Sequence, residues 1–371
     1  MKSKSNNKKL KILMLAPTPF FSDRGCHIRI LNSYLRLKRE GNQITILTYP
    51  IGRDILNIKT KRTINLPGYK KTEPGFSPYR PFLDFLLMIK SIREMKNKEY
   101  DLIYAHLHEG ALIGIILKKL FNKKAIKIIF DSQGSLVGEL SAHGTIKNKG
   151  IIKNILFSIE KYITNNSDEI ITSTEALKEF ITKNITRNIT KKQTKSIKVI
   201  RVIKDLPDKF LFNNKIKPAN LKLPKDKIIV VYLGGMQLYK GIEYLLKAIP
   251  YTPENKFHFL IMGYPVDDAK QLAKQLNIEN RITFTGKIPY EKAPSYLKLG
   301  HLAVSPKTLE SGEANAKIYN YTAMNLPVVC FDSKENREII KESKGKGYFA
   351  KDKDVKDLAK KIMEVEVKRW K

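Results

Sequence analysis

The stretch SPKTLESGEANAKIYNYTAMNLPVVCFD, residues 305–332, determines how the rest of the chain is interpreted. It begins at the end of a β-rich apolar run and passes through a polar loop that contains a glycine. An amphipathic run then opens at about Asn315, where we expect a helix to begin. Asn325 tolerates the left-handed conformation that ends many helices, and Pro327 introduces the next apolar run. The order strand, loop, helix, strand is the repeating unit of parallel α/β sheets.

The same alternation extends along the chain and predicts an α/β fold with two domains. Strands are expected at residues 11–16, 44–48, 102–105, 125–131, 169–173, 227–233, 257–262, 282–285, 302–304 and 328–331. Helices are expected at 28–40, 111–120, 241–249 and 355–371, whereas residues 50–80 read as irregular. The alternation lapses in a Lys-, Asn- and Pro-rich region. We therefore predict an N-terminal domain over 1–200, a linker over 201–226, a C-terminal domain over 227–350, and a terminal helix over 351–371 that packs back toward the N-terminal domain.

Composition excludes several classes of protein. With 42% hydrophobic and 9% aromatic residues in 371, the chain can build real cores and is not globally disordered. The two cysteines, Cys26 and Cys330, lie far apart, which excludes a disulfide framework or a cysteine-based zinc site and favours a reducing compartment. No uninterrupted apolar run approaches the ~20 residues that a membrane-spanning helix needs. The first apolar run ends at once at Pro17, so it is read as a buried strand after a basic tail rather than a signal peptide.

The net charge of +33 favours anionic partners. Nucleic acid, anionic lipid and phosphorylated substrates all fit such a surface, and so does the alternative that the lysines are merely solvated. The lysine pairs at 118–119 and 191–192 lack interleaved aromatic residues, so no nucleic-acid partner is expected.

The loop and helix start within 305–332 suit a phosphate group. The N–H groups near Ala314, Asn315 and Ala316 would lie at a helix N-terminus, and Lys317 adds a positive charge in its first turn. An ordinary strand–loop–helix connection is the alternative, and it needs no ligand.

This segment resembles the nucleotide-sugar motif of the family 4 retaining glycosyltransferases, which have the GT-B fold. The Ala323-Met324-Asn325-Leu326-Pro327-Val328-Val329 run places Asn325 at the family's glycine. The same alignment places Asn320 where the family's second Glu holds the ribose hydroxyls. The first Glu falls on Gly312, so the nearest carboxylate is Glu313, with Glu310 as the other choice.

The segment from Leu233 to Gly241 resembles the family's strand–Gly–Arg…Lys–Gly segment. In the family, the Arg and the Lys hold the diphosphate of the donor. Lys240 matches the Lys, whereas Gly235 stands where the Arg would be. The Gly234-Gly235 pair also lets backbone approach a pyrophosphate, although a plain turn would use the same residues.

The loop from Pro17 to Arg29 resembles the family's loop that closes over the donor phosphates and faces the acceptor. Gly25 gives this loop backbone freedom, and Arg24 or Arg29 can meet an anion. His27 is a further residue expected on the acceptor side. An ordinary capped turn with exposed arginines is the alternative.

Two more predicted strands end in polar residues, where parallel sheets bind ligands. His106 matches by count the His that family members carry beside the transferred sugar, with His108 as a shifted alternative. The two imidazoles also allow a metal site or simple core histidines, but a third metal ligand is missing nearby. Ser135, in the polar cluster after Asp131, is expected on the acceptor side.

Residues 81–93 form an amphipathic stretch with basic residues toward its end. Such a helix can rest on an anionic membrane surface, as peripheral glycosyltransferases do, or it can pack into the core.

The resemblance covers about residues 11–349 and implies two Rossmann-like domains whose parallel sheets face each other across a cleft, with the nucleotide sugar on the C-terminal domain and the acceptor on the N-terminal domain. It implies a hexosyltransferase-type enzyme of glycan or cell-envelope biosynthesis that moves a sugar to the hydroxyl of a glycan or lipid-linked acceptor with retention. His106 and Glu313 would contact the sugar, and Lys240 and Lys317 the diphosphate, without a metal or other cofactor. The expected location is the cytoplasm or the inner face of the membrane.

Two other functional classes remain open. One is a nucleotide-sugar-binding protein without transferase activity, because Asn320 and Gly235 depart from the family's pattern. The other is a basic polyanion-binding α/β protein, whose affinity would fall steeply with salt.

Overall fold

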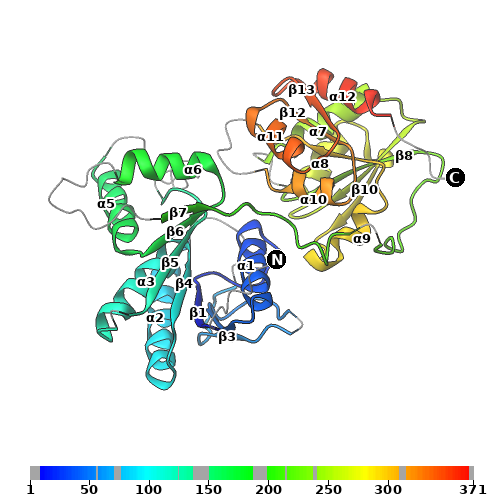
Figure 1. Cartoon of the computed structure of the whole chain (residues 1–371). Helices are drawn as coiled ribbons and strands as arrows, with labels where there is room; N and C mark the ends of the chain where they lie inside the picture. Colours follow the sequence, from blue (N-terminus) through cyan, green and yellow to red (C-terminus); the bar gives the residue numbers. More distant parts are fainter. Residues whose placement is uncertain are drawn as a thin grey trace, which may run out of the picture. The chain divides into compact units, whose positions relative to one another are not determined.

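A computed structural model describes residues 9–55, 57–70, 77–123, 125–136, 150–186, 199–213, 215–236, 240–308 and 315–366. The chain forms two compact units, Met1–Lys204 and Asp205–Lys371 (Figure 1). Each unit is built around its own parallel sheet, so the α/β fold class predicted from the sequence is confirmed.

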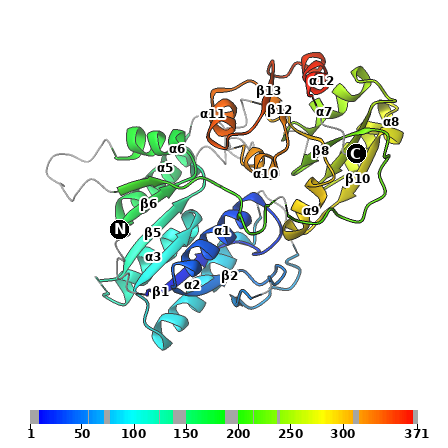
Figure 2. The same cartoon turned by 45° about the vertical axis from the view of Figure 1, so that its right-hand side comes forward.

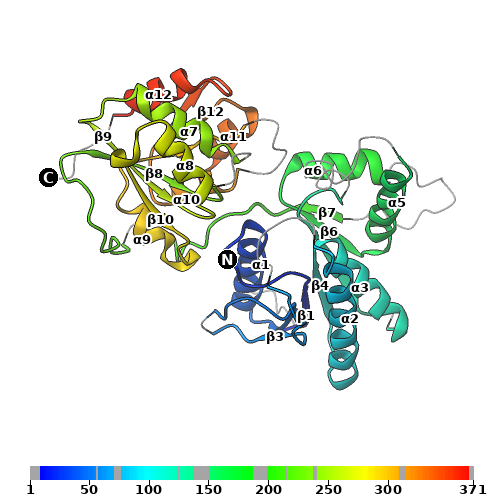
Figure 3. The ribbon, with the colours of Figure 1, turned by 180° about the vertical axis from the view of Figure 1, so that it is seen from behind.

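The N-terminal unit contains a seven-stranded sheet in the order β3-β2-β1-β4-β5-β6-β7, in which every neighbouring pair is parallel. Its strands are β1 (Lys11–Ala16), β2 (Gln43–Thr48), β3 (Thr60–Arg62), β4 (Leu102–His106), β5 (Lys127–Ser132), β6 (Glu169–Thr172) and β7 (Val199–Val202). Its helices are α1 (Gly25–Arg39), α2 (Arg80–Asn97), α3 (Leu107–Leu120), α5 (Ile151–Asn166) and α6 (Glu175–Phe180), followed by a π-helical turn over Ile181–Thr186. Figures 1 and 3 show α1 on one face of the sheet and α2 and α3 on the other.

Helices on both faces explain why the central strands read as continuous apolar runs. Leu13 and Leu15 of β1, Ile103 of β4 and Phe130 of β5 belong to a single buried cluster. The apolar side of α2 contributes to the same cluster through Leu83 and Leu87, among other residues. One side of the helix over residues 81–93 therefore packs into the core.

The C-terminal unit contains a six-stranded parallel sheet in the order β10-β9-β8-β11-β12-β13 (Figure 2). Its strands are β8 (Ile228–Leu233), β9 (Phe257–Met262), β10 (Ile282–Gly286), β11 (Leu302–Ser305), β12 (Val328–Phe331) and β13 (Gly347–Ala350). Its α-helices are α7 (Ile242–Ala248), α8 (Asp267–Gln275), α9 (Ala293–Leu297), α10 (Lys317–Ala323), α11 (Lys334–Glu342) and α12 (Val355–Glu364). Short 3₁₀ turns lie at Ile249–Tyr251, Glu279–Arg281 and Tyr290–Lys292.

The predicted C-terminal helix is α12, and its apolar side lies in the core of the C-terminal unit. Leu358, Ala359 and Ile362 are fully buried there, in one cluster with the inner residues of β8 and β9. Asp354 caps the helix, since its carboxylate accepts the backbone N–H groups of Lys356 and Asp357.

Three strands depart from the sequence prediction. β3 lies inside residues 50–80 and consists of Thr-Lys-Arg, a triplet with no apolar pattern to reveal it. β7 lies at a sheet edge and alternates exposed and half-buried residues. Its last residues fall within the segment 201–226, most of which is counted with the C-terminal unit. β13 lies at an edge of the six-stranded sheet. It is not predicted either, because Gly347 opens a run of only four residues.

Within the described residues, no helix combines the length and the apolar content needed to cross a bilayer.

Candidate functional site

Each sheet has a point where the strand order reverses, and the polar candidates gather at these two points. The order around β1 and β4 in one unit, and around β8 and β11 in the other, is that of a doubly wound sheet. Connections leave two such neighbouring strands toward opposite faces, so a crevice opens beyond their carboxyl ends, and ligands of these folds bind there.

In the N-terminal unit, the structure brings His106 together with Asp131 and Arg29. His106 ends β4 and pairs in register with Asp131 of β5. The His106 Nδ1 atom lies 2.8 Å from Asp131 Oδ2, and both side chains are completely buried. Arg29 of α1 donates to the same carboxylate, from Nη2 to Oδ1 at 2.6 Å and from Nε to Oδ1 at 2.9 Å. Burial acts to raise the pKa of Asp131, but the Arg29 charge and the His106 hydrogen bond outweigh it and lower the pKa to about 2.

Two polar atoms at this edge have no hydrogen-bond partner among the described residues. They are Nε2 of His106 and Nε2 of Gln133, which follows β5. With the ring proton on Nδ1, His106 Nε2 is an acceptor, whereas Gln133 Nε2 is a donor. A buried polar atom left unpaired costs about 1–3 kcal/mol of folding free energy. The turn beside His106 is strained as well, because Leu107 has a φ of +61°, in the left-handed region that a leucine rarely adopts. Unpaired polar atoms and backbone strain together make this edge a candidate ligand site.

His108 and Ser135 are grouped around a different residue, Glu160 of α5. His108 Nε2 lies 3.5 Å from Glu160 Oε1, and Ser135 Oγ donates to Glu160 Oε2 at 3.2 Å. Glu160 is 1% exposed, and the His108 ring packs edge-on against Phe130. The contacts of His108 thus link α3 to α5. Nothing in the sequence indicates Glu160 as the partner of His108.

His27 holds the loop between β1 and α1 from the inside. The backbone N–H of Ser22 donates to its Nδ1 atom at 2.8 Å, so Nε2 carries the proton and donates to Thr18 Oγ1 at 2.6 Å. His27 is fully buried, and both ring nitrogens are used within the loop. Gly25 is the exposed first residue of α1, preceded by Arg24, and a Cβ placed on Gly25 would meet nothing within 4 Å.

A second carboxylate, half-buried, lies near the start of α2. Tyr49 Oη donates to Asp84 Oδ1 at 2.5 Å, and Arg80 Nε lies 3.1 Å from Glu109 Oε1 in the first turn of α3. Burial, together with the Glu109 charge, raises the pKa of Asp84 from 3.8 to about 7, although the Tyr49 hydrogen bond and the Arg80 charge oppose this shift.

We expect Asp84→Asn to raise the free energy of unfolding of the N-terminal unit by about 2–4 kcal/mol at about pH 8, and to change it little near pH 3. The folded-state pKa lies above the unfolded-state value, so the folded chain binds more protons between the two and loses stability as pH rises through this window. Asparagine still accepts the Tyr49 hydrogen bond without ionising. Urea unfolding over this pH range is the measurement, with Asp54→Asn, at a carboxylate 82% exposed, as control. A pH dependence identical to that of the unsubstituted chain would contradict the expectation.

In the C-terminal unit, Lys317 lies against the backbone of Gly234. A Cβ on Gly234, whose φ is +156°, would lie 2.8 Å from Lys317 Nζ. The same ammonium lies 4.3 Å from the ring centroid of Tyr232, whose hydroxyl donates to the Gly235 carbonyl. The first residue of α10 is thereby held at the carboxyl end of β8, next to the Gly234-Gly235 pair.

Gly241 brings the loop after β8 onto the loop after β11. It has a φ of +87°, and a Cβ there would lie 1.9 Å from the Pro306 carbonyl oxygen. Lys240 immediately precedes it. The contact therefore holds the two loops of the switch point backbone against backbone.

The Asn315 side chain takes part in a buried network. Ser305 Oγ donates to Asn315 Oδ1 at 2.8 Å, and Asn315 Nδ2 donates to Asn336 Oδ1 at 2.9 Å. The Asn315 N–H points to the Glu335 carboxylate at 3.3 Å. Asn320 is half-buried on α10, and Asn325 has the expected left-handed φ of +57°. Glu313 and Ala314 lie outside the described residues, as does Glu310.

The residues that sequence reasoning missed are Asp131 as the partner of His106, Gln133 and Tyr232. Arg29, which the sequence indicates as an anion contact, is 5% exposed and pairs with the Asp131 carboxylate. The one available signal was that Asp131 ends the strand next to the one that ends in His106. Among the described residues, no group of three or more His, Cys, Asp or Glu side chains is arranged to hold a metal ion.

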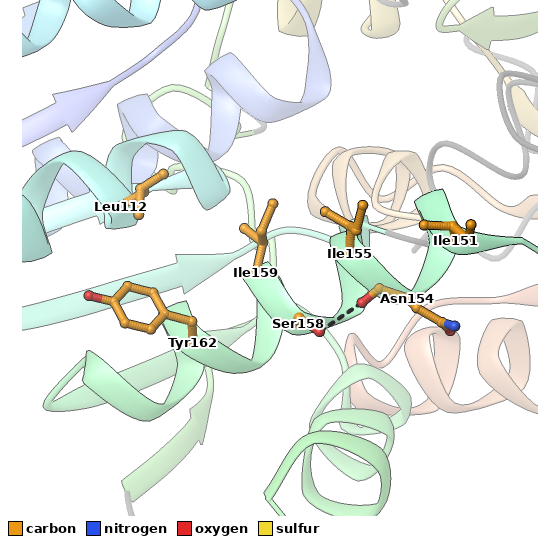
Figure 4. A pocket seen from close by; sticks show the side chains of 7 residues that line it. All are labelled: Leu112, Ile151, Asn154, Ile155, Ser158, Ile159 and Tyr162. Atoms are coloured by element: carbon orange, nitrogen blue, oxygen red, sulfur yellow. Dashed lines mark hydrogen bonds between the residues drawn. The ribbon is translucent and has the colours of Figure 1, made fainter.

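An apolar groove of about 470 Å³ lies away from these strand ends, on the surface of the N-terminal unit. Figure 4 shows Ile151, Ile155 and Ile159 on the same side of α5, with Leu112 on α3 nearby. Ser158 donates to the Asn154 carbonyl within the helix. Ile151 and Ile155 are 78% and 53% exposed, which leaves an apolar stripe on this helix.

Comparison with known proteins places the C-terminal half in a described family. Residues 213–369 match the profile of glycosyl transferases group 1, so the chain carries a glycosyltransferase group 1 domain. An uncharacterized glycosyltransferase of Methanocaldococcus jannaschii is 24% identical over 282 residues, which cover 73% of this chain. The chain spans 62% of that relative's length.

Two solved structures have the same fold along nearly the whole chain. Sucrose-phosphate synthase from Thermosynechococcus elongatus superposes with a TM-score of 0.71 at 18% identity, covering 96% of this chain and 89% of that one. The Anabaena protein HepE, in complex with UDP and glucose, gives 0.65 at 15% identity, covering 95% and 88%. At these identities the likeness shows the fold, two Rossmann-like units of the GT-B type.

Proposed function

We propose that the chain is a retaining glycosyltransferase of family 4 that moves a hexose from a nucleoside-diphosphate sugar to an acceptor hydroxyl. The observation that carries the proposal is Lys317, held against Gly234 at the switch point of the domain that matches glycosyl transferases group 1. The UDP bound to the Anabaena relative supports a nucleoside diphosphate as the leaving group.

The chemistry requires that negative charge on the departing diphosphate be stabilised. Lys317 and Lys240 supply positive charge, and the absence of side chains at Gly234 and Gly235 lets phosphate oxygens approach the loop backbone. A metal ion is not needed for this role. His106 forms a hydrogen bond with the sugar as positive charge develops at the anomeric carbon, and Glu313 orients the sugar ring. Asn320 replaces a carboxylate at the ribose and holds it more weakly.

For the acceptor, we propose a glycan or a lipid-linked glycan, bound on the N-terminal unit near Gly25 and Arg24, at the inner face of a membrane. Phe82 and Phe85 of α2 are 52% and 50% exposed and contact each other, and basic residues follow them on the same helix. Sedimentation with phosphatidylglycerol vesicles tests this placement, and equal recovery with phosphatidylcholine vesicles would argue against it.

A nucleotide-sugar-binding protein without transferase activity is the second candidate. Gly235 and Asn320 favour it, because each stands where the family has a charged residue. Release or transfer of sugar from the nucleotide separates the two functions.

We expect one nucleoside diphosphate among UDP, GDP, ADP and dTDP to raise the unfolding temperature. A ligand at 100-fold its dissociation constant stabilises the folded state by about 2.7 kcal/mol. Thermal unfolding with each nucleotide is the measurement, and heparin serves as the polyanion control. A shift with heparin alone would mean that the net charge of +33, rather than a donor site, determines binding.

A further inference from the structure

The carboxylate of Asp131 is shared between two partners that come from different elements. Its Oδ1 atom accepts two hydrogen bonds from Arg29, and its Oδ2 atom accepts from His106 Nδ1 at 2.8 Å. Arg29 Nε also lies 3.1 Å from Oδ2, and its Nη1 donates to the Ile203 carbonyl at 2.8 Å. The exposed fractions of the three side chains are 5%, 0% and 0%, so water does not compete for these bonds.

This arrangement fixes where the proton of His106 resides. A carboxylate paired with a guanidinium only accepts, so the His106 nitrogen facing it must be the donor. With the proton on Nδ1, the lone pair is on Nε2, the buried atom that has no partner among the described residues. The ring also packs against Tyr104, with the centroids 5.0 Å apart, and so cannot turn easily.

We propose that Asp131, held by Arg29, is the positioning residue that keeps His106 in the Nδ1–H tautomer, so that Nε2 accepts a hydrogen bond from a hydroxyl of the transferred sugar. The role of Nε2 toward the sugar rests on the proposed function. The tautomer rests on the geometry of the chain alone.

The tautomer is measured on the full chain labelled with ¹⁵N-histidine. Of the six histidine signals, that of His106 is the one missing from the spectrum of His106→Gln. Correlations between ring protons and ring nitrogens then tell which nitrogen is protonated. We expect the proton of the neutral ring on Nδ1 in the unsubstituted chain. A proton on Nε2 would overturn the proposal.

Asp131→Asn gives the sharper test because it has nearly the same shape. Arg29 retains its donors and holds the new amide oxygen, so the amide NH₂ group faces His106 and donates to Nδ1. The proton is then expected on Nε2, the reverse of the unsubstituted chain. An unchanged tautomer in the folded variant would contradict the proposed control by Asp131.

Kinetics separate positioning from a merely structural role. With UDP-glucose, UDP-N-acetylglucosamine and GDP-mannose as donor probes, we expect Asp131→Asn to lower kcat about 10–100-fold, as does loss of one hydrogen bond to the transition state. Nucleotide affinity should be unchanged. The double variant with His106→Gln should be no slower than His106→Gln alone, because Asp131 acts through His106. Additive losses would overturn the proposal. Absence of turnover with every donor in the unsubstituted chain would instead count against the proposed function, and the tautomer result would still stand.

Discussion

We expect Gly241→Ala to destabilise the C-terminal unit by more than about 4 kcal/mol, enough to prevent it from folding stably. The methyl group would lie 1.9 Å from the Pro306 carbonyl oxygen and 2.7 Å from its carbon. Both atoms are backbone, so no side chain can rotate away. The backbone must instead separate at the point where the loops after β8 and β11 meet, and α7 begins at the very next residue.

Gly286→Ala is the matched control for this substitution. Gly286 also has a positive φ, +67°, in the same unit, but a Cβ there meets nothing within 4 Å. It should lose only the roughly 1–2 kcal/mol of the left-handed conformation. Urea unfolding of both variants measures the difference, and equal stabilities would show that the two loops do not meet as the structure has them.

The second large effect is expected from Lys317→Met, which should lower donor-dependent turnover about 10²–10³-fold. Methionine keeps an unbranched stem against Gly234 and the Tyr232 ring but removes the charge. Loss of the contact between ammonium and ring costs only about 0.5–2 kcal/mol of stability, so the variant remains folded. Steady-state rates are measured with sugar donors that carry the nucleotide identified by thermal unfolding.

Lys334→Met controls for the loss of one positive charge from the same unit. The Lys334 side chain is 92% exposed on α11, so its loss should leave turnover unchanged. If Lys317→Met retained the rate of this control, the diphosphate would have to be held by other residues, and the donor site would need to be sought elsewhere.

The sequence predicts the buried strands of both sheets because burial on two faces leaves a continuous apolar signal. Lys11–Ala16, Phe257–Met262 and Val328–Phe331 have the bounds that their patterns indicate. The edge strands Thr60–Arg62 and Gly347–Ala350 carry no such signal and became visible only in the structure, whereas the edge strand Ile282–Gly286 has an apolar pattern and is predicted. Helix starts were less predictable: α3 begins at Leu107, four residues before the apolar run indicates, because a strained turn replaces a cap.

For the site, the sequence indicates which residues end strands but not which of them meet. His106 is predicted from the resemblance and Lys317 from its place in the first turn of a predicted helix, and the structure places each at a switch point of its own sheet. The partner of His106 is separated from it by 25 residues, and Arg29 by 77, so no local pattern connects them. His27 is a different case, because its partners Thr18 and Ser22 belong to the same loop and hold its side chain inside that loop.

The bond from Arg29 to the Ile203 carbonyl has a mechanical consequence. Ile203 is fixed on both sides, since its own N–H donates to the Thr172 carbonyl at 2.9 Å. On the far side of the connection, Asp208 caps a turn by accepting the N–H of Phe210, within the C-terminal unit. The chain therefore leaves the N-terminal unit directly after a residue that is held on both sides. The guanidinium that holds Asp131 thus also fixes the segment through which the chain leaves this unit.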